Sequence, residues 1–301
     1  MATEGGDDRA RRPADPAADE RARYEYAGGD VDRPGLVSDL EDLVDGEVRF
    51  DEYTRTLYAT DASAYEVTPI GVVFPTNTDD VAAVVGYCHE QSIPVLPRGG
   101  GTSLAGQTVN EAVVLDFTRN MDTVVSVDSG ARTATAEPGV LLGDLDAALE
   151  SDGLKFAPDP AWGDKSALGG AIGNNSTGSH SLVYGKTDAY LEEVEAVLAD
   201  GTVHRFGEVT PEAWRERADA DDAVGRAYGA LLSVVEESAD DVRAAAPELK
   251  RNVSGYNLDR LVDEYEAVRA GDRKTVNLAR AFAGSEGTLG VVTEEIGRAH
   301  V

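Results

Sequence analysis

Residues 97–107, which read PRGGGTSLAGQ, place three consecutive glycines between an arginine and two hydroxyl side chains. Because glycine has no Cβ, its backbone can approach a ligand closely and can adopt positive φ. Successive N–H groups of such a loop can converge on an anion, and the hydroxyls of Thr102 and Ser103 can add donors. The segment therefore predicts a site for a phosphate-bearing ligand, with a plain flexible turn as the alternative.

Two familiar phosphate-binding loops are excluded by the spacing of this segment. It does not end in the Gly-Lys-Ser/Thr of a nucleoside-triphosphate P-loop. It also lacks the G-x-G-x-x-G pattern of the Rossmann fold, since Leu104 stands three residues after Gly101. The loop must belong to another class of anion site.

Two further segments are rich in glycine. Residues 158–185 contain LGGAIGNNSTG followed by a Tyr-Gly pair, and residues 284–293 read GSEGTLGVVT. Glycines this dense among small residues favour close approach of the backbone to a flat or anionic ligand. His180, inside the first of these segments, is the one histidine near this chemistry, either as a solvated loop residue or as a contact to the bound ligand or substrate.

The elements that must position these loops are strands and helices in mixed order, which predicts an α+β fold. Residues 70–75, 93–97 and 112–116 read as buried strands. An amphipathic helix capped by Asn77 or Thr78 joins the first two, so the first glycine loop lies at a strand end, where such folds bind ligands. Other predicted elements are hairpins over 124–136 and 191–206, a helix over 141–149 and a largely helical stretch over 213–246.

The composition is strongly acidic, with 27 Lys and Arg against 56 Asp and Glu and a formal net charge of −29. Such a charge repels phosphate backbones and anionic lipids, so nucleic acid and membrane surfaces are excluded as main partners. No apolar run reaches the roughly 18 residues of a membrane span, and no secretory signal is present, so we expect a cytoplasmic protein. Because self-repulsion destabilises a compact state unless salt screens it, we hypothesise a salt-rich, halophilic cytosol.

The single cysteine, Cys88, excludes an intrachain disulfide, a cysteine zinc site and an iron–sulfur cluster held by this chain alone. Cys88 falls on the apolar face of the predicted helix with Val81 and Val84, so we interpret it as a core residue. We predict no metal site.

Taken together, the three glycine-rich segments and VEAVLADGTV (residues 194–203) resemble the FAD-binding domain of the vanillyl-alcohol oxidase and p-cresol methylhydroxylase family. Within it, the chain is most similar to the FAD-linked D-2-hydroxyacid dehydrogenases of the D-lactate, glycolate and D-2-hydroxyglutarate type. The resemblance covers roughly residues 70–293. It implies a two-subdomain FAD-binding fold of the p-cresol methylhydroxylase type, with subdomains of about 70–125 and 126–294.

The resemblance also implies the residues that contact the cofactor. The FAD pyrophosphate would be wrapped by Arg98, Gly99, Gly100, Gly101, Thr102, Ser103, Gly106 and Gln107. The flavin ring and ribityl chain would be lined by Pro158, Asp159, Gly169, Gly170, Gly173, Asn174, Asn175, Ser176 and Gly178, with Tyr184 and Gly185 closing the loop. Glu286 and Gly287 would complete the pocket, and the backbone of Val197 would face the adenine. Relatives that bond the flavin often use a histidine in the first loop; since none stands there, we expect non-covalent FAD.

The resemblance implies oxidation of a D-2-hydroxyacid by hydride transfer to the flavin. The base and the groups that bind the substrate carboxylate normally come from a C-terminal cap domain, so the catalytic residues stay unknown here. Residues 295–301 resemble translated sequencing-adapter DNA, and we expect a non-native tail on a truncated reading frame that lacks this cap. Relatives sharing residues 61–81 look like fusions with an iron–sulfur half, so clusters are expected only in that missing part and the electron acceptor is open.

The predicted organisation is then a disordered acidic tail (1–34), a helical lead-in (35–69), the FAD-binding domain (70–294) and the tail described above. Three alternatives stay open. The first is another enzyme on the same fold, either an oxidase of alcohols, sugars or aldonolactones or a cell-wall-type reductase. The second is a flavin-binding subunit that needs a separate catalytic partner, and the third is an acidic α+β domain without a cofactor.

Overall fold

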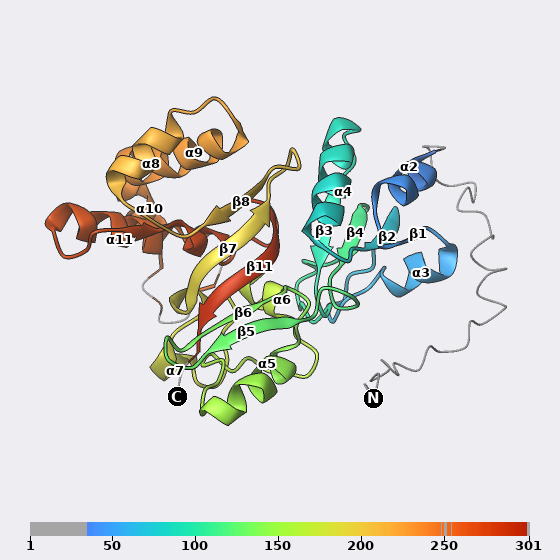
Figure 1. Ribbon diagram of the computed structural model, residues 1–301, viewed down its shortest axis with the longest axis horizontal. Helices are drawn as coiled ribbons and strands as arrows, with labels where there is room; N and C mark the ends of the chain where they lie inside the picture. The colour runs from blue at the N-terminus through green and yellow to red at the C-terminus, as the bar shows by residue number, and fades with distance from the viewer. Residues whose placement is uncertain (1–34, 248, 250–251, 254, 300–301) are drawn as a thin grey trace, which may run out of the picture.

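The computed structural model describes residues 35–299 apart from 248, 250–251 and 254. The predicted acidic tail over 1–34 lies outside the described residues, as do residues 300–301. Two sheets carry the fold, one built from the blue and cyan part of the chain and one from its green, yellow and red parts (Figure 1). This is the two-subdomain α+β architecture that the resemblance implies.

The first subdomain holds a four-stranded sheet. Its strands, in spatial order, are β1 (Glu47–Arg49), β2 (Gly71–Phe74), β4 (Val113–Asp116) and β3 (Val95–Arg98). Both β2 and β3 run parallel to β4, while β1 is antiparallel to β2. The helices around this sheet are α2 (Leu36–Leu43), α3 (Glu52–Leu57) and α4 (Thr78–Glu90).

The predicted β-α-β unit is confirmed. The Asn77 side chain accepts a hydrogen bond from the Asp80 N–H at 2.8 Å and caps α4, as its position before two acidic residues indicates. Val81, Val84 and Cys88 are fully buried in one cluster with the sheet, so Cys88 is a core residue.

The second subdomain holds a five-stranded antiparallel sheet. Its strands, in spatial order, are β5 (Val124–Asp128), β6 (Thr133–Ala136), β11 (Val291–Arg298), β7 (Leu191–Val197) and β8 (Val203–Phe206). Both predicted hairpins form, and the final strand enters between them to pair with β6 and with β7. The predicted domain boundary at residue 294 therefore falls inside β11, whose pairing continues to Arg298.

Helices surround this second sheet. Between β6 and β7 the chain forms α5 (Leu142–Leu149), η1 (Glu150–Asp152), α6 (Leu168–Gly173), α7 (Ser181–Tyr184) and η2 (Thr187–Ala189). After β8 come β9 (Glu208–Val209), α8 (Pro211–Ala218), α9 (Ala223–Glu237), α10 (Ala239–Ala245), α11 (Leu258–Ala270), β10 (Val276–Asn277) and η3 (Leu278–Phe282). The helices α8 to α10 confirm the helical stretch predicted over 213–246 and lie together at one end of the molecule (Figure 1).

The two subdomains share a core. Val197 of β7 and Val291 of β11 belong to the same buried cluster as Val84 of α4 and Leu115 of β4. The β7–β8 turn also rests on α4, since a Cβ on Gly201 would lie 2.9 Å from the carbonyl oxygen of Ala82. Among the described residues, no helix combines the length and apolar character needed to cross a bilayer.

Candidate cofactor site

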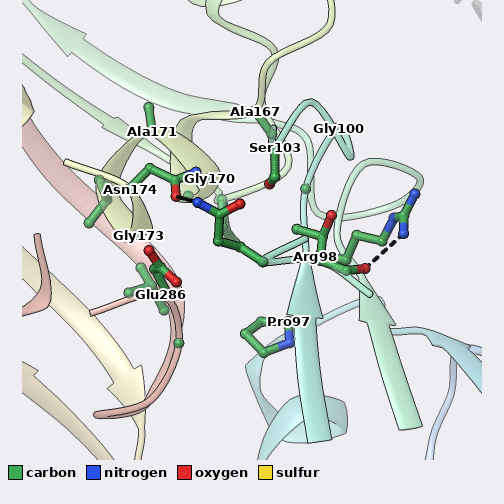
Figure 2. Close-up of a pocket in the computed structure, with 18 of the residues that line it drawn as sticks. Pro97, Arg98, Gly100, Ser103, Ala167, Gly170, Ala171, Gly173, Asn174 and Glu286 are labelled. Atoms are coloured by element: carbon green, nitrogen blue, oxygen red, sulfur yellow. Dashed lines mark hydrogen bonds between the residues drawn. The ribbon is translucent and has the colours of Figure 1, made fainter. Parts of the chain in front are cut away.

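The three glycine-rich segments meet around one cavity between the subdomains, with a volume of about 880 Å³ including its open mouth (Figure 2). The predicted contacts that line it are Arg98, Gly99, Gly100, Gly101, Thr102, Ser103, Gln107, Gly169, Gly170, Gly173, Asn174, Ser176, Glu286 and Gly287. Segments nearly 200 residues apart in the sequence are thus brought to one place by β3, α6 and the turn before β11.

The first glycine loop packs tightly against the second subdomain. A Cβ on Gly100 would lie 1.7 Å from the carbonyl oxygen of Lys165, and one on Gly99 would lie 2.8 Å from the Cβ of Ala167. The hydroxyls of Thr102 and Ser166 are 3.2 Å apart across the same junction. The glycines are therefore needed for contact between subdomains as well as for access to a ligand.

The backbone amides of this loop are free to bind a ligand. Within the described part of the chain, none of the N–H groups of residues 99–104 donates a hydrogen bond to a protein acceptor. Gly101 has φ +63°, a left-handed conformation that turns the chain within the loop. Unpaired amides at the edge of a cavity are costly unless water or an anion accepts from them, so the arrangement fits a phosphate group.

Arg98 lines the cavity, but its guanidinium does not face into it. The side chain extends away from Asn174 and Glu286 (Figure 2) and donates hydrogen bonds to backbone carbonyls on the far side of the loop. Sequence reasoning placed this cation on the pyrophosphate, and the structure places it behind the loop.

The opposite wall is formed by α6 and the turn after η3. A Cβ on Gly170 would meet nothing within 4 Å, so this residue leaves open space on the cavity side. Glu286, with φ +51°, donates its backbone N–H to the carbonyl of Gly173 at 3.0 Å. The Gln107 amide donates to the Asn174 side chain at 3.4 Å, which links the two walls (Figure 2).

Eight predicted contacts do not line the cavity: Gly106, Pro158, Asp159, Asn175, Gly178, Tyr184, Gly185 and Val197. Asn175 is buried and has φ +46°; its side chain accepts from the Asp188 N–H at 3.0 Å and faces the protein interior. Val197 is fully buried in the shared core. In these positions the residues shape the loops that surround the cavity.

Asp159 and its neighbours form a second, separate cluster. Its carboxylate accepts from Lys155 and from the Ser179 hydroxyl, both at 2.9 Å, and these hydrogen bonds lower the pKa of Asp159 below its usual value. A Cβ on Gly178 would lie 1.8 Å from the Asp159 carbonyl oxygen, so this glycine permits the contact. The half-exposed His180 lies 3.6 Å from the same carboxylate, outside the cavity lining.

The structure adds lining residues that sequence reasoning missed: Pro97, Thr108, Phe117, Pro138, Ser166, Ala167, Ala171, Ile172, Phe282, Ser285, Gly290 and Val292. Several adjoin the glycine motifs and could have been found from that adjacency. Phe117 and Pro138 come from segments without a glycine motif and are brought in only by the packing of the two sheets. The mixed lining of amides, hydroxyls and apolar side chains suits a ligand with both an anionic and a flat aromatic part.

A two-subdomain α+β fold with such a cavity at its junction fits a domain that binds a phosphate-bearing cofactor. Residues 69–207 match a family described as an FAD binding domain. The chain is 32% identical over 252 residues to D-2-hydroxyglutarate dehydrogenase of Pseudomonas putida, covering 83% of this chain and 24% of that protein. It is 33% identical over 258 residues to glycolate oxidase subunit GlcD of Bacillus subtilis, covering 84% of this chain and 42% of that protein.

The fold comparison agrees. A solved alkyldihydroxyacetonephosphate synthase superimposes with a TM-score of 0.60 at 20% identity, over 89% of this chain and 44% of that one. Residues 69–207 therefore form an FAD-binding domain, and the chain is similar to proteins named D-2-hydroxyglutarate dehydrogenase and glycolate oxidase subunit, in agreement with the resemblance. The chain spans 24% of the length of the Pseudomonas putida protein and 42% of the length of the Bacillus subtilis protein.

Proposed function

We propose that this chain binds FAD non-covalently in the cavity and forms the flavin-binding part of an enzyme that oxidises a D-2-hydroxyacid, with D-lactate and D-2-hydroxyglutarate as first candidates. The observation that carries the proposal is the row of unbonded amides over residues 99–103 at the cavity edge. These amides would hold the pyrophosphate, while the glycine-lined face of α6 would receive the flat part of the cofactor.

The lining supports a non-covalent cofactor. Among the described residues that line the cavity there is no histidine, cysteine or tyrosine to form a bond to the flavin ring. When bound, FAD supplies the two-electron redox chemistry, and the protein binds, orients and tunes it. Ser103, with 8% of its surface exposed, and Thr102 are the hydroxyl donors nearest the free amides.

Titratable side chains are few among the described residues that line the cavity. Arg98 and Glu286 are the titratable side chains among the described lining residues, and the Arg98 guanidinium is held by carbonyls. A general base and a cationic site for the substrate carboxylate are therefore proposed to come from another domain of a longer protein. The same observation favours the second candidate, a flavin-binding subunit that acts with a separately encoded catalytic partner.

The test is an absorbance spectrum of the purified protein, followed by acid precipitation. We expect flavin absorption bands between the near ultraviolet and the blue. Acid precipitation should release the flavin into the supernatant, because no covalent bond holds it. Bleaching of those bands by D-lactate or D-2-hydroxyglutarate in the full-length gene product would support a dehydrogenase. Rapid oxygen consumption by the reduced protein would favour an oxidase, and bleaching that requires a second polypeptide would favour the subunit.

A further inference from the structure

Arg98 ends β3 and precedes the glycine loop, and only 9% of its surface is exposed. Its Nη1 donates to the carbonyl oxygens of Thr108 at 2.9 Å and Tyr58 at 3.3 Å, and its Nη2 donates to that of Thr60 at 2.8 Å. The guanidinium carbon also lies 5.1 Å from the centre of the Tyr58 ring. Every one of these partners is neutral.

These bonds connect both ends of the loop. Thr108 follows the loop as Arg98 precedes it, so one guanidinium joins the two flanks of residues 99–107. Tyr58 and Thr60 belong to the segment after α3, and the Ala62 N–H in that segment donates to the Gly101 carbonyl at 3.1 Å. Since the C=O and N–H of a trans peptide point in opposite directions, this bond turns the Thr102 N–H away from that segment.

No carboxylate lies within 4.0 Å of the guanidinium in the described part of the chain. Asp116, the carboxylate with the largest electrostatic effect on Arg98, already accepts hydrogen bonds from the Tyr58 hydroxyl at 2.5 Å and from Thr118. Burial lowers the pKa of Arg98 below its usual value, and Asp116 partly offsets this effect. The position of the guanidinium is thus set by a fork of carbonyl acceptors, for which the planar arginine group is well shaped.

We propose that Arg98 is a positioning residue that holds residues 99–107 in the conformation whose amides face the cavity, without itself contacting the anion. This inference rests on the proposed function for the identity of the ligand. It assigns the affinity for the phosphate to the backbone, and it makes the segment after α3 a support of the cofactor loop.

Hydrogen exchange of the cofactor-free protein tests the positioning directly. We expect Arg98→Lys and Arg98→Gln to speed exchange of the hydrogen-bonded amides of Ala62 and Val67 by roughly tenfold, because neither side chain reproduces the fork. Arg119→Gln is the matched control, since Arg119 is an exposed cation at the edge of the same sheet, paired with Glu47 at 2.6 Å. Unchanged exchange in both Arg98 variants would overturn the inference.

Titration with FAD gives the second readout. If Arg98 positions the loop, the lysine and glutamine variants bind FAD about equally weakly, roughly tenfold below wild type. If Arg98 contacts the phosphate, lysine restores most of the affinity and glutamine does not, which contradicts the inference. A wild-type chain that binds no FAD refutes the proposed function, whereas the exchange experiment still decides the role of Arg98.

Discussion

Gly100 and Gly170 line the same cavity for different physical reasons. Gly100 touches the backbone of the other subdomain, where a Cβ would lie 1.7 Å from the Lys165 carbonyl oxygen. Gly170 leaves its Cβ position open, with no atom within 4 Å. One glycine therefore serves the closure of the two subdomains, and the other keeps space free for a ligand.

Alanine at these two positions separates folding from binding. Gly100→Ala forces the backbone apart and is expected to lower the free energy of unfolding by about 1–3 kcal/mol and to weaken FAD binding. Gly170→Ala is expected to leave stability unchanged or raise it by up to about 1 kcal/mol, since alanine favours helix. Its methyl group would still enter the cavity and weaken FAD binding roughly tenfold. Thermal denaturation and FAD titration of both variants check this, and a Gly170→Ala chain with wild-type affinity would contradict it.

Residue types alone predicted the glycine loops, because a glycine lacks a Cβ whatever residues surround it, and its backbone can therefore approach other atoms closely. They did not predict the direction of the Arg98 guanidinium or the interior position of Asn175. Both depend on acceptors distant in the sequence, such as the Thr60 carbonyl for Arg98 and the Asp188 N–H for Asn175.

At the scale of elements, β11 is the least predictable part of the fold. The β-α-β unit and both hairpins follow from alternation, caps and turns, all of which are local signals. The central place of β11 between β6 and β7 requires pairing across more than 90 residues, which no local pattern encodes. The sequence prediction ended the domain at residue 294, inside this strand, because residues 295–301 resemble translated adapter DNA.

Glu295 in β11 is poorly matched to its surroundings. It is 3% exposed, and neither carboxylate oxygen has a hydrogen-bond partner among the residues that the structure describes. Its side chain lines a mostly apolar cavity of about 440 Å³, including the open mouth, together with Leu145, Leu149 and Phe156. Burial, then repulsion from Glu294 and Glu137, raises the pKa of Glu295 well above its usual value.

Replacing this carboxylate should stabilise the protein. Glu295→Leu is expected to raise the free energy of unfolding at pH 7 by about 2 kcal/mol or more, because it removes an unpaired buried acid. Glu216→Leu, on the exposed face of α8, controls for the lost charge. Denaturant unfolding of both variants measures the effect, and a Glu295→Leu chain no more stable than wild type would refute the interpretation.

The same group gives a pH dependence of defined sign. Below the unfolded-state pKa near 4.5, Glu295 is protonated in both states and has no ionisation penalty. Above that pH only the unfolded state loses the proton, so wild-type stability falls as pH rises toward the raised folded-state pKa. The advantage of Glu295→Leu over wild type should therefore shrink between pH 7 and pH 4.5; an advantage independent of pH would contradict this.

At the scale of the whole molecule, the main feature is the large excess of acidic residues. The formal net charge is −29, and only five of the 27 basic residues are lysines. Some acids are paired, as where Arg205 meets Glu193 at 3.1 Å and Glu195 at 3.1 Å, but the excess remains. This field opposes both the compact fold and the approach of an anionic cofactor.

Salt should therefore help this protein rather than weaken it. We expect the melting temperature and the affinity for FAD both to rise as KCl is increased from dilute buffer to molar concentrations, because screening reduces self-repulsion. Calorimetry and FAD titration over a KCl series measure this. Equal stability in dilute buffer and in molar salt would contradict the hypothesis of a salt-rich cytosol.

We propose that the free amides of residues 99–103 hold the cofactor pyrophosphate. Amide NMR of the isotope-labelled chain, titrated with FAD in high salt, tests this role most directly. We expect saturable shifts concentrated on the glycine amides of this loop and weaker shifts in α6. FAD binding that leaves those amide signals in place, or no binding at all, would contradict it.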